Sequence, residues 1–97
     1  FGAGNKFEEV MAAFGDRPKV RVIRMRKVPF VDSTGIHNLT TLCEMSKKED
    51  IQIVLSGVCE KVNAQLEHAG FYNLLGKENI TDHISKALKR AEEIIKE

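Results

Sequence analysis

The feature that most constrains this chain is an apolar run that leads into hydrogen-bonding residues and then into a helical repeat. Residues 20–28 are rich in β-branched side chains without helical spacing, which predicts a strand over Val20–Met25. Asp32-Ser33-Thr34-Gly35 follows this run. Apolar or small residues then recur every three to four positions, as on one face of a helix: Ile36, Leu39, Leu42, Cys43 and Ser46. The chain therefore passes from a strand to a helix at Asp32–Gly35.

The same order of strand, turn and helix is predicted a second time. A compact apolar run over residues 51–55 ends at Ser56-Gly57, and Val62, Leu66 and Ala69 then line one helical face that ends at Gly70. A last helix opens at Thr81 or Asp82 with a long apolar stripe: Ile84, Ala87, Leu88, Ala91, Ile94 and Ile95. Alternating strands and helices predict an α/β domain with a small, largely parallel sheet, whose ligand sites collect at the carboxyl ends of the strands.

The N-terminal region predicts a further helix. Phe7, Val10, Met11 and Phe14 recur at helical spacing, with Asn5 and Glu8 placed as in a capping box and Gly15 at the end. Asp16-Arg17-Pro18 then predicts a turn. Two strands are too few for a stable sheet, so we expect further strands upstream of Phe1 or near Ile80.

Composition excludes several classes of function. A chain of 97 residues with 42% apolar content fits one domain over residues 1–97. Its net charge of +1 provides no general attraction for nucleic acid. No apolar run approaches the roughly 20 residues that span a bilayer, so no direct membrane insertion of these residues is expected. Cys43 and Cys59 lack CxxC spacing and are predicted to be free, buried thiols.

The Asp32–Gly35 corner has two interpretations. Asp, Ser and Thr are ordinary helix N-caps, which makes a purely structural role the simpler one. The same corner also presents two hydroxyls beside unpaired backbone N–H groups and the positive end of a helix dipole, where an anion or a phosphate is stabilised. Both interpretations remain open on the residues alone.

Little in the sequence favours chemistry. His37 follows Thr34 by three positions and could act as its base, but no third, orienting group can be named. His37, His68 and His83 have no metal-ligand spacing, and we expect surface or capping roles for them and no metal or cofactor. Arg21, Arg24 and Arg26 are predicted to form either a solvated strand face or a docking face for an acidic partner, since no aromatic residues interleave with them as RNA-stacking platforms.

The chain resembles the STAS domain, which is shared by sulfate transporters and bacterial anti-sigma-factor antagonists. Residues 22–35, VIRMRKVPFVDSTG, look like its central strand and signature turn, and residues 55–58, LSGV, look like its next strand and turn. Residues 62–71, VNAQLEHAGF, are similar to its later helix, and the opening Phe-Gly-Ala resembles the strand end that precedes the first helix in SulP anion transporters.

The resemblance implies an α/β STAS fold with about four helices and one or more N-terminal strands before Phe1. It implies a non-enzymatic regulatory or protein-interaction domain of a SulP-type sulfate transporter, on the cytoplasmic side of the inner (plasma) membrane. The implied partner is the transmembrane domain of the same transporter, with a kinase, an acyl carrier protein or a nucleotide as further candidates. Thr34, with Ser33 beside it, matches the position that is phosphorylated in the antagonist branch, so a soluble phosphorylation switch is the alternative function.

Overall fold

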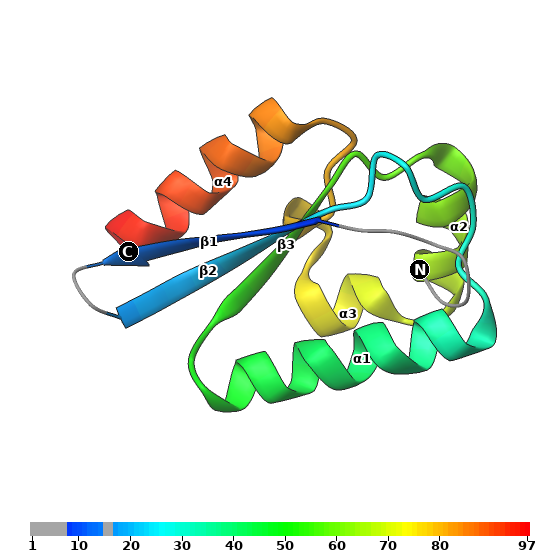
Figure 1. The fold of residues 1–97 in the computed structure, drawn as a ribbon, viewed down its shortest axis with the longest axis horizontal. Helices are drawn as coiled ribbons and strands as arrows, with labels where there is room; N and C mark the ends of the chain where they lie inside the picture. Colours follow the sequence, from blue (N-terminus) through cyan, green and yellow to red (C-terminus); the bar gives the residue numbers. More distant parts are fainter. Residues whose placement is uncertain (1–7, 15–16) are drawn as a thin grey trace.

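The computed structural model describes residues 8–14 and 17–97, with side chains from residue 18 onward. Strands and helices alternate over most of this length (Figure 1). The elements, in chain order, are β1 (Glu8–Phe14), β2 (Arg17–Arg24), α1 (Ser33–Lys48), β3 (Gln52–Ser56), α2 (Glu60–His68), α3 (Phe71–Leu75), a 3-10 turn η1 (Lys77–Asn79) and α4 (Ile84–Lys96). The predicted α/β class, with about four helices and a small mixed sheet, is confirmed over the described residues.

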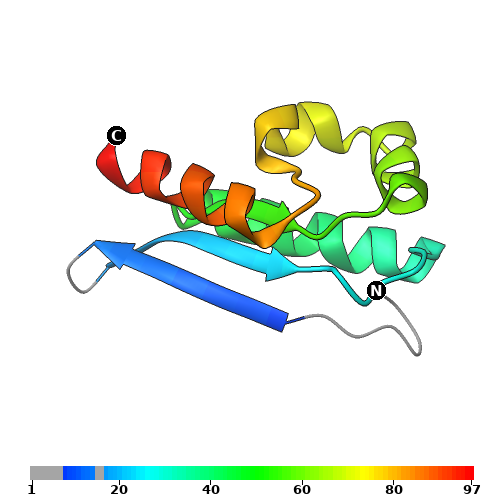
Figure 2. The ribbon, with the colours of Figure 1, turned by 90° about the horizontal axis from the view of Figure 1, so that it is seen from above.

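The sheet has the strand order β1-β2-β3, with β1 at one edge beside β2 (Figure 2). β1 and β2 are antiparallel, and their register pairs Val10 with Val22. β2 and β3 are parallel, and their register pairs Val22 with Val54. Because parallel strands need a long crossover, the chain between them crosses through α1. A single parallel bridge between Leu55 and Ile80 extends the sheet beyond β3, as expected for the segment near Ile80.

The sheet is covered on both faces, with α4 on one side and α1 and α3 on the other (Figure 1). Alternate residues of β2 and β3 therefore enter different cores. The larger core joins Ile23 and Leu55 of the sheet to Leu39 of α1, Leu66 of α2 and Phe71 of α3. The smaller core lies beneath α4: Val20, Val22, Val54, Ala87, Ala91 and Ile94. Burial on both faces explains the continuous apolar run over residues 53–55 of β3.

The N-terminal helix predicted from Phe7, Val10, Met11 and Phe14 is wrong, because residues 8–14 form strand β1. The antiparallel ladder with β2 supplies backbone hydrogen bonds along this segment, and this long-range pairing overrides a helical spacing of only a few apolar residues. Arg17 and Pro18 belong to β2 and not to the predicted turn. The predicted cap at Asn5 and the helix end at Gly15 lie outside the described residues, as does Asp16.

The later elements follow the predictions with small shifts. β3 and α2 have the expected positions, and the short segment after Gly70 forms α3, with Phe71 buried. The last helix begins later than predicted, since His83 and not Thr81 or Asp82 is its N-cap. Leu88, which was placed on the apolar stripe of this helix, is half exposed.

Candidate functional site

Asp32 caps α1 and fixes the corner that the sequence singled out. Its backbone is extended, and the Gly35 N–H donates to its Oδ1 at 2.7 Å. The Ile36 N–H donates to the Asp32 carbonyl oxygen at 2.9 Å. The predicted capping role is therefore confirmed. The corner does not follow the strand directly, however, because residues 25–32 form an irregular connection between β2 and α1.

This connection is tied to α2. The Val31 N–H donates to Gln65 Oε1 at 2.8 Å, and Val31 itself is buried. One residue earlier, Phe30 is 41% exposed, and the Lys61 Nζ lies 5.8 Å from its ring centroid. The corner is thus held in place by its cap and by α2, and it presents an exposed aromatic ring and a cation beside the start of α1.

Ser33 and Thr34 are exposed in the first turn of α1, and no acidic residue lies in that turn. Their hydroxyls are accessible at the positive end of a helix dipole, where added negative charge is stabilised. No hydrogen bond joins Thr34 to His37 in the described part of the chain, and both side chains are exposed to water.

The three arginines proposed to meet an acidic partner do not share one face. Arg21 is half-buried and donates from one guanidinium nitrogen (Nη1) to Ser46 Oγ on α1 at 3.0 Å. Alternation along β2 directs Arg24, also half-buried, toward the opposite face of the sheet. Arg26 lies in the turn after β2 and is exposed. Only Arg26 is therefore fully available to a partner as the fold stands.

The histidines have the surface and capping roles that were expected. All three are exposed, and the Ser85 N–H donates to Nδ1 of His83 at 3.0 Å at the start of α4. No group of three or more His, Cys, Asp or Glu side chains that could hold a metal is found among the residues that the structure describes. In the same residues, no helix is both long and apolar enough to cross a membrane.

The two cysteines are free but differ in environment. Cys43 is buried in the larger core, and this burial, with a smaller contribution from the charge of Glu44, raises the pKa of its thiol to about 12. Cys59 is exposed at the start of α2, so the prediction that both thiols are buried is wrong for this residue. Cys59 is the N-cap residue of α2, and its Sγ lies 3.9 Å from the Val28 carbonyl oxygen.

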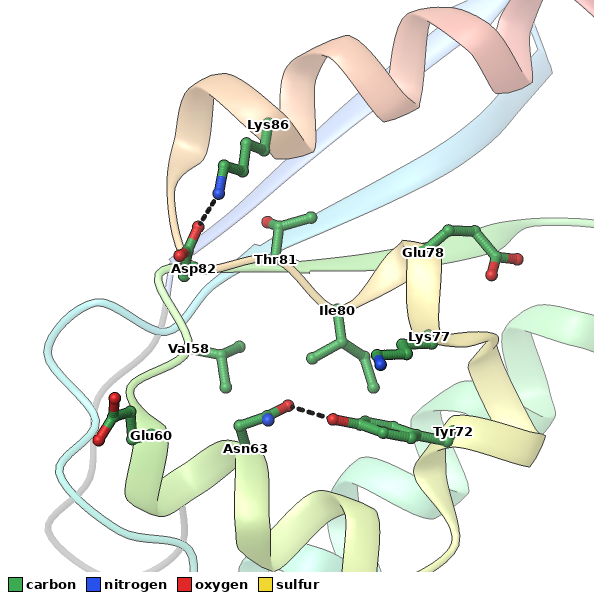
Figure 3. A pocket seen from close by; sticks show the side chains of 10 residues that line it. All are labelled: Val58, Glu60, Asn63, Tyr72, Lys77, Glu78, Ile80, Thr81, Asp82 and Lys86. Carbon is green, nitrogen blue, oxygen red and sulfur yellow. Dashed lines mark hydrogen bonds and ion pairs between the residues drawn. The ribbon is translucent and has the colours of Figure 1, made fainter.

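Sequence reasoning missed a pocket of about 370 Å³ that lies beyond the carboxyl end of β3 (Figure 3). Its lining comes from three separate segments: Val58, Glu60, Asn63, Tyr72, Lys77, Glu78, Ile80, Thr81, Asp82 and Lys86. Val58 and Asn63 lie in the LSGV and VNAQLEHAGF segments that carry the family resemblance, but these segments did not indicate a pocket. The only available signal was the general rule that ligand sites collect at the carboxyl ends of parallel strands, which had been applied to the Asp32 corner alone.

Comparison with known proteins supports the resemblance. A family model of the STAS domain matches residues 3–91. Sulfate transporters 1.2 and 1.3 of Arabidopsis thaliana are 33% identical over 82 residues and 31% identical over 83 residues. Each match covers 84% of this chain, which spans only 13% of the length of these curated relatives.

Two solved structures are similar in both sequence and fold. A sulfate transporter family protein from Wolinella succinogenes has a TM-score of 0.80 and 38% identity, over 87% of this chain and 69% of the other. A SulP transporter STAS domain from Vibrio cholerae has a TM-score of 0.77 and 30% identity, over 89% of this chain and 67% of the other. The chain therefore belongs to the STAS domain family, and the STAS domains of sulfate transporters are among its relatives.

Proposed function

We propose that the chain is the regulatory, protein-interaction domain of a SulP-type anion transporter and acts at the cytoplasmic side of the plasma membrane. The observation that carries this proposal is the similarity to sulfate transporters and to a SulP STAS domain, in sequence and in fold. In this function, residues 1–97 work as one unit, and the main partner is the transmembrane domain of the same protein.

The docking surface in this proposal is the start of α1 with the connection before it. Ser33 and Thr34 offer exposed hydroxyls, while Phe30 and Lys61 offer an apolar ring and a cation beside them. Aromatic residues are enriched at protein interfaces, and a cation beside them favours an acidic partner segment. The proposed role needs no catalytic group.

Phosphorylation of Thr34 would change this surface through charge. The helix dipole stabilises an added phosphate, whereas the Asp32 carboxylate, already used as the cap, repels it. The balance of these effects would alter how the surface meets its partner without unfolding the domain. Ser33 is the second candidate position. A kinase would then be a transient partner, and an acyl carrier protein or a nucleotide would meet the exposed Arg26.

The test uses the full transporter that contains this chain. Cells expressing the wild-type protein, Thr34→Glu, Thr34→Ala or the control Thr41→Glu are assayed for sulfate uptake and for the amount of transporter at the membrane. Thr41 is also exposed on α1, but it lies two helical turns further on. We expect Thr34→Glu to change uptake per transporter and Thr41→Glu to leave it unchanged. Equal uptake by all four proteins would argue against regulation through this corner.

A soluble phosphorylation switch is the second candidate, and the exposed Thr34 hydroxyl is the observation that favours it. The parent reading frame separates the two functions, because apolar spans long enough to cross a bilayer should precede this chain in a transporter. For the switch, incubation with the cognate kinase followed by mass spectrometry should place a phosphate on Thr34 or Ser33. Labelling of Thr34→Ala as strong as that of wild type would exclude Thr34 as the main site.

A further inference from the structure

The pocket beyond β3 has walls that the fold holds in place. After β3 ends at Ser56, the Val58 N–H donates to the Thr81 carbonyl oxygen at 3.0 Å. Below this contact in Figure 3, the Tyr72 hydroxyl donates to Asn63 Oδ1 at 3.1 Å and links α3 to α2. Because these walls are tied together before a ligand arrives, the entropic cost of binding is lowered.

Most of the charged lining residues are turned away from the pocket or already paired. Figure 3 shows the Glu60 carboxylate directed away from the pocket. The Glu78 carboxylate lies against Gly76, where a Cβ would be 2.5 Å from its Oε1. Asp82 Oδ1 lies 2.9 Å from the Lys86 Nζ, and the hydrogen bond and charge of Lys86 lower the pKa of the Asp82 carboxyl. All three carboxylates are exposed to water, so they repel an anion inside the pocket only weakly.

Lys77 is the lining cation that remains. Its Nζ lies 5.7 Å from the Tyr72 ring centroid, and Figure 3 shows it beside Ile80. No salt bridge joins Lys77 to a carboxylate among the residues that the structure describes. Its ammonium group can therefore take one negative charge of a ligand. A nucleoside triphosphate carries several negative charges, for which the lining offers no second cation without a partner.

An apolar surface leads away from Lys77. Figure 3 places Ile80 between Lys77 and Val58, with the ring of Tyr72 below them. Val58 is buried and Ile80 is half-buried, so both can remove hydrocarbon from water. The volume of about 370 Å³ is at the small end for ligand pockets. These features fit a small molecule with one negatively charged end and a short apolar body.

We propose that this pocket binds a small aliphatic monocarboxylate, with its carboxylate at the Lys77 ammonium and its hydrocarbon chain against Ile80 and Val58. The Glu60 carboxylate stays in water and takes no part in binding. Binding of this kind does not depend on the transporter role, and within a transporter it would make the domain responsive to an organic acid.

The test is isothermal titration calorimetry of the purified 97-residue chain. The probes are the straight-chain carboxylates from acetate to octanoate, and three comparisons with hexanoate: hexanamide, which lacks the charge, hexylamine, which reverses it, and sulfate, which lacks the apolar body. We expect each added methylene to tighten binding by about 2- to 4-fold until the pocket is filled. Hexanamide should bind more weakly than hexanoate by about 3- to 10-fold, as for loss of one partly exposed charged contact. Hexylamine and sulfate should also bind more weakly than hexanoate.

Three results would overturn the proposal. One is the absence of binding by every carboxylate at about 10 mM. Another is binding of hexanamide or hexylamine as tight as that of hexanoate, which would remove the role of the charge. The third is binding of acetate or sulfate as tight as that of hexanoate, which would remove the role of the apolar surface.

Variants locate the site. Lys77→Gln should weaken hexanoate binding by about 3- to 10-fold, whereas Glu60→Gln should change it by less than about 2-fold. Both residues are exposed, so their variants should melt like wild type. Lys89→Gln is the matched control, because Lys89 is an exposed lysine of α4 outside the pocket. Unchanged binding by Lys77→Gln, or weakening by Lys89→Gln or Glu60→Gln equal to that by Lys77→Gln, would show that the ligand is held differently.

Discussion

Asn79 is a buried polar residue that joins three elements, and its truncation is the sharpest test of how this fold is held together. Asn79 is only 4% exposed. Its Nδ2 donates to the Leu75 carbonyl oxygen of α3 at 2.7 Å, and its Oδ1 accepts from the Arg90 Nε of α4, also at 2.7 Å. Asn79 itself is the last residue of η1, so its side chain joins this turn to α3 and α4.

The cost of Asn79→Ala can be worked from these two contacts. A neutral hydrogen bond contributes about 1 kcal/mol and one to a charged group about 1.5 to 3 kcal/mol, and a buried carbonyl left without its partner adds to the loss. Arg90 keeps contacts with Glu93 at 3.6 Å and Glu97 at 4.0 Å, and its side chain is 21% exposed, so its charge is not stranded. We therefore expect Asn79→Ala to lower the free energy of unfolding by about 2 to 4 kcal/mol.

The assay is urea unfolding followed by far-ultraviolet circular dichroism. Asn73→Ala is the matched control, because Asn73 is exposed on α3 and its loss should cost less than about 0.5 kcal/mol. A double-mutant cycle with Arg90→Met should give a coupling energy of about 1 to 2 kcal/mol between the two side chains. An Asn79→Ala protein as stable as the control, or additive single and double variants, would refute the reasoning.

Three further predictions address the core, a turn and the thiols. Leu66→Ala should cost about 2 to 5 kcal/mol in urea unfolding, since Leu66 is fully buried; a loss below about 1 kcal/mol would contradict its place in the core. Gly57→Ala should lower the melting temperature, because φ is +67° and a Cβ would lie 2.9 Å from the Arg26 Cα and backbone nitrogen; unchanged melting would show that this turn relaxes. At neutral pH, a thiol reagent should label Cys59 in the native protein and Cys43 only on unfolding, because burial raises the Cys43 pKa to about 12. From about pH 9 upward the Cys43 thiol loses its proton in the unfolded chain but keeps it in the folded one. Between about pH 9 and 12 the free energy of unfolding should therefore fall more steeply in the wild type than in Cys43→Ala, by up to about 1.4 kcal/mol per pH unit. Equal falls in both proteins would contradict this.

Local patterns were sufficient where short-range physics decides the conformation. Asp32 was predicted as a cap because a carboxylate placed before a helical repeat can accept from a backbone N–H three residues on, and Gly35 makes this contact. The helix after it and strand β3 followed from periodicity and β-branched content. The last helix was found from its stripe, although its start was shifted because His83 takes the capping role.

Long-range pairing decided the remainder. Residues 8–14 have apolar residues at helical spacing, yet they form β1 because β2 provides a partner for the backbone, and no local rule reveals a partner. Strand alternation separates Arg21 from Arg24, which a linear list of arginines had grouped as one face.

The sequence by itself determined the capped corner at Asp32, the alternation of strands and helices, and the residues that carry the STAS resemblance, because each depends on contacts within a few positions of the chain. Only the tertiary structure decided that residues 8–14 are a strand and that Asn79 joins α3 to α4. It also placed Lys77 and Glu60 around one pocket. These features depend on contacts between separate elements. The contacts form only when the helices pack on the two faces of the small sheet.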